Sequence, residues 1–180
     1  MNLTIREAYY NAGIGVLARK LNIGLRQLTI GFEHQYFSGP KLEGLQELSL
    51  ADVAFSASGR QEIEDYLTVC LGGIAGEQIY VLANRRQLHW AQGDAAYLWK
   101  FWRRTQECGD PEVDRAFAIA MAYLRNYDLG DPNATVWRLW QRAVNLLQQL
   151  PQREQLDRLA KQLLFVGKLS GDEVFLILDQ

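Results

Sequence analysis

Histidine and cysteine, the residue types that most often bind transition metals, are scarce in this chain. The 180 residues include two histidines, His34 and His89, and two cysteines, Cys70 and Cys108. A zinc site in a protein takes three or four ligands drawn from histidine, cysteine and carboxylate side chains. Any such site here must therefore be rich in carboxylates or must combine residues far apart in the sequence.

One combination of this kind is His34 with His89 and Asp94. The three residues would form a set of two imidazoles and a carboxylate if the loops that carry them converge. The alternative reading is structural. Isolated loop histidines commonly lie at the surface or form ordinary hydrogen bonds, and Asp94 precedes an Ala-Ala-Tyr-Leu pattern as a typical helix N-cap does.

The sequence around the two cysteines does not indicate a catalytic thiol. Cys70 falls on the apolar face of a helical pattern, which indicates a buried core thiol rather than a nucleophile. Cys108 follows a helical pattern with no adjacent base. Two isolated thiols exclude a secreted framework held by several disulfides, and they suit a reducing compartment.

The composition indicates a globular, cytoplasmic protein. Apolar residues make up 48% and charged residues 22%, and 19 basic against 21 acidic residues give a net charge of −2. This balance argues against nucleic-acid binding, which uses a basic surface. The first residues do not form a targeting pattern, and the longest apolar run, 117–124, is short against the roughly 20 residues of a transmembrane helix.

Helical periodicity dominates the chain, which predicts a mainly α (α+β) fold in a single domain over residues 1–180. Alternation over 25–32 predicts a strand, so we expect a small β element near residues 25–55 and a helical C-terminal part over 110–180. Capping patterns at Thr4 and Ser58 begin predicted helices over 4–21 and 58–82, others begin near 94, 111, 131 and 156, and Ser170 caps a last one. The segment 48–55 fits either a second strand or irregular structure. Glycines inside the first two helices predict close packing against another element, since each costs about 1 kcal/mol in helix propensity.

Four of the five tryptophans occur as pairs three residues apart, Trp99 with Trp102 and Trp137 with Trp140. Residues at this spacing share one face of a helix. We therefore expect the two faces to meet in the core or to form an oligomer contact. The basic residues between 97 and 104 allow a stacking platform for nucleic acid as another reading, which the net charge disfavours.

Four segments, in order, resemble the peptidase domain of FtsH-type ATP-dependent zinc metalloproteases. Residues 8–14 read Ala-Tyr-Tyr-Asn-Ala-Gly-Ile, where that family has Ala-Tyr-His-Glu-Ala-Gly-His. Residues 67–77 read Leu-Thr-Val-Cys-Leu-Gly-Gly-Ile-Ala-Gly-Glu, similar to its Leu-x-x-Leu-Leu-Gly-Gly-Arg-Ala-Ala-Glu. Residues 90–94 match the Gly-Ala-x-Asn-Asp that holds the third zinc ligand, and 169–174 mirror Leu-x-Gly-Glu-Glu-Val. A Walker-type loop is missing, so the resemblance covers the peptidase part without an AAA ATPase domain.

The resemblance implies a zinc site, and the residues at its positions do not fit one. Two histidines one helical turn apart place both imidazoles on the same metal, and the adjacent glutamate acts as the general base. This chain has Tyr10, Asn11 and Ile14 at those positions, and Asp94 alone matches a ligand. We therefore predict no catalytic residues and no bound cofactor, and a pseudoenzyme that acts as a binding or assembly module.

Two other functions stay open from the sequence. One is a hydrolase or metal-dependent enzyme of altered chemistry that uses His34, His89 and Asp94, or Glu77 from the Gly-Gly helix. The other is a small-ligand binder in the former zinc pocket, unless Tyr10 and Ile14 fill that pocket with apolar bulk. Because the resembled family assembles as hexameric rings, protein partners or a homo-oligomer are expected.

Overall fold

The structure is a computed structural model of the chain, and it describes residues 3–30, 41–42, 57–84 and 132–180. Helices α1 (Leu3–Lys20), α3 (Ala57–Asn84), α6 (Pro132–Gln148), α7 (Leu150–Val166) and α8 (Gly171–Leu178) dominate this part, with short strands β1 (Leu25–Thr29), β2 (Lys41–Leu42) and β3 (Lys168–Ser170). The predicted mainly α (α+β) class is confirmed.

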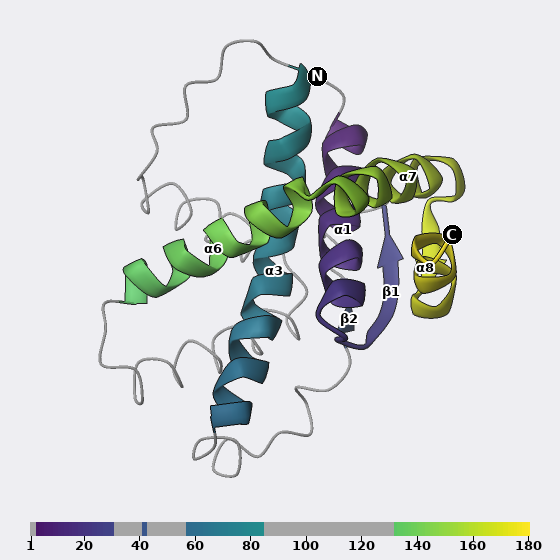
Figure 1. Cartoon of the computed structure of the whole chain (residues 1–180). Coiled ribbons are helices and arrows are strands. Elements are labelled where there is room, and N and C mark those ends of the chain that lie inside the picture. The colour runs from purple at the N-terminus through teal and green to yellow at the C-terminus, as the bar shows by residue number, and fades with distance from the viewer. Residues whose placement is uncertain (1–2, 31–40, 43–56, 85–131) are drawn as a thin grey trace.

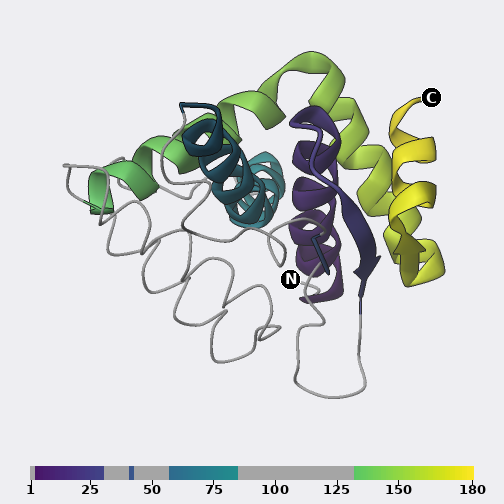
Figure 2. The same cartoon turned by 90° about the horizontal axis from the view of Figure 1, so that it is seen from below.

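Helices α1 and α3 form the centre of the molecule and lie side by side, with α6 crossing α3 and α7 crossing α1 (Figure 1). On the other side of α1 lie β1 and α8 (Figure 2). Helix α1 is therefore enclosed from several directions, and its middle is buried from Asn11 to Ala18. Apolar side chains from every described helix meet around it in one core.

Glycines make the close approach of α1 and α3 possible. A Cβ atom added to Gly13 would collide with the carbonyl oxygen of Gly72 and lie 3.1 Å from the Cα of Gly76. A Cβ on Gly76 would collide with the carbonyl oxygen of Tyr9. The prediction that mid-helix glycines mark tight packing is confirmed, because each of these positions faces backbone of the other helix.

The sheet has the order β2-β1-β3, and both pairings are antiparallel. Strand β3 pairs Lys168 with Thr29 and Leu169 with Leu28, so the C-terminal part of the chain closes onto the first strand. Gly171 follows immediately, and a Cβ there would collide with the carbonyl oxygen of Leu25. The predicted β element near 25–55 is thus present, and β3 is a strand that the sequence analysis did not predict.

The predicted ends of the elements differ from the observed ones in several places. The capping patterns at Thr4 and Ser58 lie inside their helices, which begin at Leu3 and Ala57. The predicted strand 25–32 ends at Thr29. Helix α7 begins at Leu150, ahead of Pro151, because proline is tolerated in the first turn, where its missing N–H has no acceptor to lose.

The capping box at Ser170 is confirmed. The backbone N–H of Glu173 donates to the Ser170 hydroxyl, and the Ser170 N–H donates to the Glu173 carboxylate at 2.7 Å. The predicted helix starts near 94 and 111 and the ambiguous segment 48–55 lie outside the described residues.

Helix α3 bears on the expectation that no segment of the chain spans a membrane. Within the described part of the chain, its segment Gln61–Ala83 is long and apolar enough, by length and composition, to cross a membrane. However, 78% of its most apolar stretch is buried inside the protein. A core helix explains the same composition, because the segment packs against α1 and α6.

Candidate functional site

The three positions that would carry the zinc motif lie in the middle of α1, and their side chains take part in packing. Ile14 is 2% exposed and belongs to the apolar core. The ring of Tyr10 covers Gly73 of α3 so closely that a Cβ there would lie 2.6 Å from two ring carbons. These two side chains therefore fill space beside the Gly-Gly helix with apolar surface.

Asn11 lies one residue further along α1 and is 3% exposed. Its Nδ2 donates to the backbone carbonyl of Glu7 at 3.0 Å, the bond to the preceding turn that is common for short polar side chains inside helices. Its Oδ1 is buried and has no hydrogen-bond partner among the described residues. A carboxamide cannot take up a proton as a glutamate base does, so this side chain is unsuited to activating water.

Asp94, His34 and His89 lie outside the described residues, so the structure does not show whether they approach α1. Within the described ranges, histidine, cysteine and carboxylate side chains do not gather in a group of three that could hold a metal ion. Tyr10 and Ile14 do not fit a zinc site in their own right. Isoleucine has no lone pair, and the Tyr10 ring is committed to the contact with Gly73.

Glu77, the carboxylate considered for altered chemistry, is held by an ion pair. It is mostly buried on α3 and accepts hydrogen bonds from the Arg6 guanidinium of α1. Because α1 and α3 run antiparallel, this pair lies beyond the glycine contact, near the N-terminal end of α1. The pairing gives Glu77 a structural role that joins the two helices.

Tyr9 connects three helices at the same end of the molecule. Its ring stacks on Tyr80 of α3 with centroids 4.4 Å apart, and its hydroxyl donates to the Asp157 carboxylate of α7 at 2.9 Å. Burial, followed by the hydrogen bond to Asp157 and the negative charge of that residue, raises the pKa of Tyr9 to about 12. The hydroxyl therefore stays protonated at neutral pH and serves as a donor.

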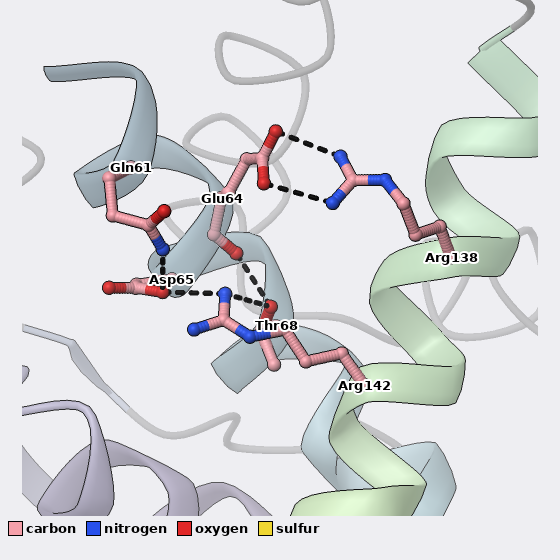
Figure 3. A network of polar contacts seen from close by, with 6 residues as sticks. All are labelled: Gln61, Glu64, Asp65, Thr68, Arg138 and Arg142. Atoms are coloured by element: carbon pink, nitrogen blue, oxygen red, sulfur yellow. Dashed lines mark hydrogen bonds and ion pairs between the residues drawn. The ribbon is translucent and has the colours of Figure 1, made fainter. Parts of the chain in front are cut away.

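A second polar network joins α3 to α6 (Figure 3). Arg138 forms a two-pronged ion pair with Glu64, with N–O distances of 2.8 and 3.0 Å. One turn further on, Arg142 lies 2.6 Å from an Asp65 carboxylate oxygen and also reaches the Thr68 hydroxyl at 3.5 Å. The two arginines lie one turn apart on α6 and face adjacent acids on α3, so the network fixes how these helices align.

Sequence reasoning missed both networks because their partners are far apart in the chain. A usable signal was present for the second one. Glu64 and Asp65 lie at the start of the mainly apolar segment 63–82, and Arg138 and Arg142 have the spacing of one helix face. Charged residues on a buried helix are usually paired, so an arginine partner was a fair expectation.

The structure describes one of the two cysteines and two of the four paired tryptophans. Cys70 is buried in the core, and burial raises the pKa of its thiol to about 12, as expected for an inert thiol. Trp137 and Trp140 are half-buried, pack on the core and contact each other with ring centroids 4.8 Å apart. Trp99, Trp102 and Cys108 lie outside the described residues, so the meeting of the two tryptophan faces stays a prediction.

Comparison with known proteins gives no further assignment. No protein-family model matches the chain, and no curated protein matches it.

Proposed function

We propose that this chain is a catalytically inactive metallopeptidase-like domain of the FtsH type that acts as a binding or assembly module. The packing of α1 on α3 supports the proposal. Gly13 comes from the segment similar to the zinc motif, and Gly72 and Gly76 come from the segment similar to the Gly-Gly motif. These glycines face each other across the helix pair, so the two segments share one contact, as parts of one ancestral site would.

The observation that carries the inactive part of the proposal is the state of residues 10, 11 and 14. Ile14 is a core residue, Tyr10 packs on Gly73, and the Asn11 amide is bound to its own helix. Together these three side chains supply neither an imidazole to bind zinc nor a carboxylate to act as base toward water. Retained packing with altered site residues favours a role in binding over a role in hydrolysis.

Two measurements on the purified full chain test this proposal. We expect less than about one-tenth of a zinc ion per chain by inductively coupled plasma mass spectrometry, and no cleavage of casein with or without added zinc. The variant Tyr10→Phe should behave identically, since the tyrosine hydroxyl has no catalytic role in this account. Stoichiometric zinc together with casein cleavage that a chelator abolishes would refute the proposal.

An enzyme of altered chemistry and a small-ligand binder remain the competing functions. The contact of Glu77 with Arg6 and the packing of Tyr10 and Ile14 disfavour both. Asp94→Ala separates them from the proposal. Loss of bound metal, of a bound small molecule or of any measurable turnover in that variant would favour a functional site at Asp94 over a module without one.

A further inference from the structure

The C-terminal segment after Gly167 packs as one unit on α1, β1 and α7. Strand β3 pairs with β1, and α8 lies beside β1 (Figure 2). Val174 and Leu178 of α8 are buried in the core, and a Cβ added to Gly15 of α1 would lie 3.2 Å from Cγ1 of Val174. The segment therefore occupies a fitted apolar site that elements earlier in the chain form.

Side chains of α1 and α7 also hold the far end of α8. Arg19 donates two hydrogen bonds to the Asp179 carboxylate, at 2.8 and 3.1 Å, and its guanidinium carbon lies 5.6 Å from the ring centroid of Phe175. Gln155 and Arg158 donate to carbonyl groups in the last turn of α8 at 2.6 and 3.2 Å. Arg19 and Asp179 are both exposed, and exposed ion pairs contribute little to stability. These contacts therefore define where the end of α8 docks more than they prevent it from leaving.

A single residue, Gly167, links α7 to β3. Its φ of 77° lies in the left-handed region that favours glycine, and a Cβ there would meet no atom within 4 Å in the described part of the chain. The open space around this hinge residue leaves room for the chain to take another direction. The three residues before it, Leu164, Phe165 and Val166, are consecutive and exposed, Phe165 to 86%, so the end of α7 has little apolar cover within one chain.

We propose that residues 168–180 exchange between two copies of the chain, so that β3 and α8 of each copy pack on α1, β1 and α7 of the other. A second copy presents the same β1 edge, the same surface at Gly15 and the same Arg19, so the contacts of the segment are kept and only the direction of the chain at Gly167 changes. A foreign segment would have to reproduce all of these contacts. Where the two chains cross, the α7 ends come together and Phe165 gains apolar neighbours. The inference rests on the proposed assembly role and names the segment that performs it.

Disulfide trapping between two different chains tests the exchange directly. In a Cys108→Ser background, Thr29→Cys and Lys168→Cys are made as separate single variants, because Thr29 and Lys168 lie directly opposite each other in the pairing of β1 with β3. Opposed residues of antiparallel strands have Cα atoms about 4.5–5.5 Å apart, a separation that a disulfide spans. Neither variant can form this bond within one chain. The two variants are mixed, refolded together from urea so that slow exchange cannot hide the dimer, and oxidised.

A covalent heterodimer joined at positions 29 and 168 forms only if the segment of one chain packs on the other. Since a short linker keeps a segment at an effective concentration in the millimolar range, we expect exchange in on the order of a tenth of the chains at about 0.1 mM protein, and in more at higher concentration. In the control mixture Glu62→Cys replaces Thr29→Cys. Glu62 is exposed on α3, whose first turns lie apart from α8 in both views (Figures 1 and 2).

The hinge residue gives a second and independent test. Adding Gly167→Ala to both variants should raise the heterodimer about tenfold, because a Cβ disfavours the left-handed conformation that the unexchanged chain needs there. A heterodimer yield equal to that of the control mixture overturns the inference, and so does a yield that Gly167→Ala leaves unchanged or lowers. Failure of the exchange leaves the assembly role standing, whereas zinc-dependent casein cleavage refutes the proposed function whether or not the segments exchange.

Discussion

The contact between α1 and α3 depends on Gly13 having no side chain. A Cβ at this position would collide with the Gly72 carbonyl oxygen and lie 3.0 Å from its carbonyl carbon and 3.1 Å from the Cα of Gly76. All three neighbours are backbone atoms of α3, which cannot rotate away as a side chain can. Gly13→Ala therefore forces the two helices apart.

The magnitude follows from two opposing effects. Alanine gains about 1 kcal/mol of helix propensity over glycine. Overpacking against a fixed neighbour costs about 1–3 kcal/mol, and occasionally more. If the helices instead move apart by up to about 1 Å, the contacts between them lose a quarter to a half of their dispersion energy. The cost here lies at or beyond the upper end because the clash is with backbone, so we expect a net loss of about 2 kcal/mol.

Urea unfolding followed by circular dichroism measures this loss. With a slope of about 2 kcal/mol per molar urea, the midpoint of Gly13→Ala should fall by about 1 M. Gly15→Ala is the matched control in the same helix. Its Cβ would meet side-chain atoms alone, the ends of Leu159 and Leu28 at 2.8 and 2.9 Å and Val174 Cγ1 at 3.2 Å, and side chains can move. A Gly13→Ala protein as stable as the wild type, or more stable, would refute the glycine-contact reasoning.

Three further predictions follow from the polar and thiol groups. Arg138→Ala leaves the mostly buried Glu64 carboxylate without its two-pronged partner, and unfolding should show a loss of about 1–2 kcal/mol, kept modest because the arginine is half exposed; an unchanged midpoint contradicts the network's role. The pKa of Tyr9 is raised to about 12 from 10.0, so the unfolded chain loses this proton first and stability should fall between pH 10 and 12. Tyr9→Phe should remove that part of the pH dependence of stability. Absorbance titration at 295 nm of both proteins measures the ionisation of Tyr9 itself. In a Cys108→Ser background, Cys70 should react with a disulfide reagent at pH 8 only after denaturation, because its thiol is buried with a pKa of about 12; fast reaction of the folded protein contradicts this.

The parts of the fold that sequence could predict are those set by local chemistry. Mid-helix glycines predicted that α1 and α3 each pack closely against another element, because a glycine in a helix needs a packing reason; that they pack on each other came from the structure. The Ser170 capping box predicted the start of α8, since the cap satisfies N–H groups within four residues. Both signals are complete within a single stretch of sequence.

The parts that sequence did not predict depend on long-range contacts. Strand β3 has three residues, of which only Leu169 is apolar, and it exists because β1 offers it a pairing edge. The bond of Tyr9 to Asp157 spans 148 positions, and nothing in the local sequence points to it. For the candidate site, the types of residues 10, 11 and 14 predicted the loss of zinc chemistry, but their packing against Gly73 and the core needed the structure.

We propose that Tyr10 and Ile14 stand at the sequence positions of two zinc ligands in the resembled family, with Asp94 at the position of the third. Restoring the two histidines in the double variant Tyr10→His/Ile14→His tests this proposal most directly. Zinc binding is measured by isothermal titration calorimetry. The variant is used only if circular dichroism shows the wild-type helix content. We expect about one zinc per chain in this double variant, and loss of that binding when Asp94→Ala is added. A folded double variant that binds no zinc, or that binds it equally well without Asp94, would contradict the claim.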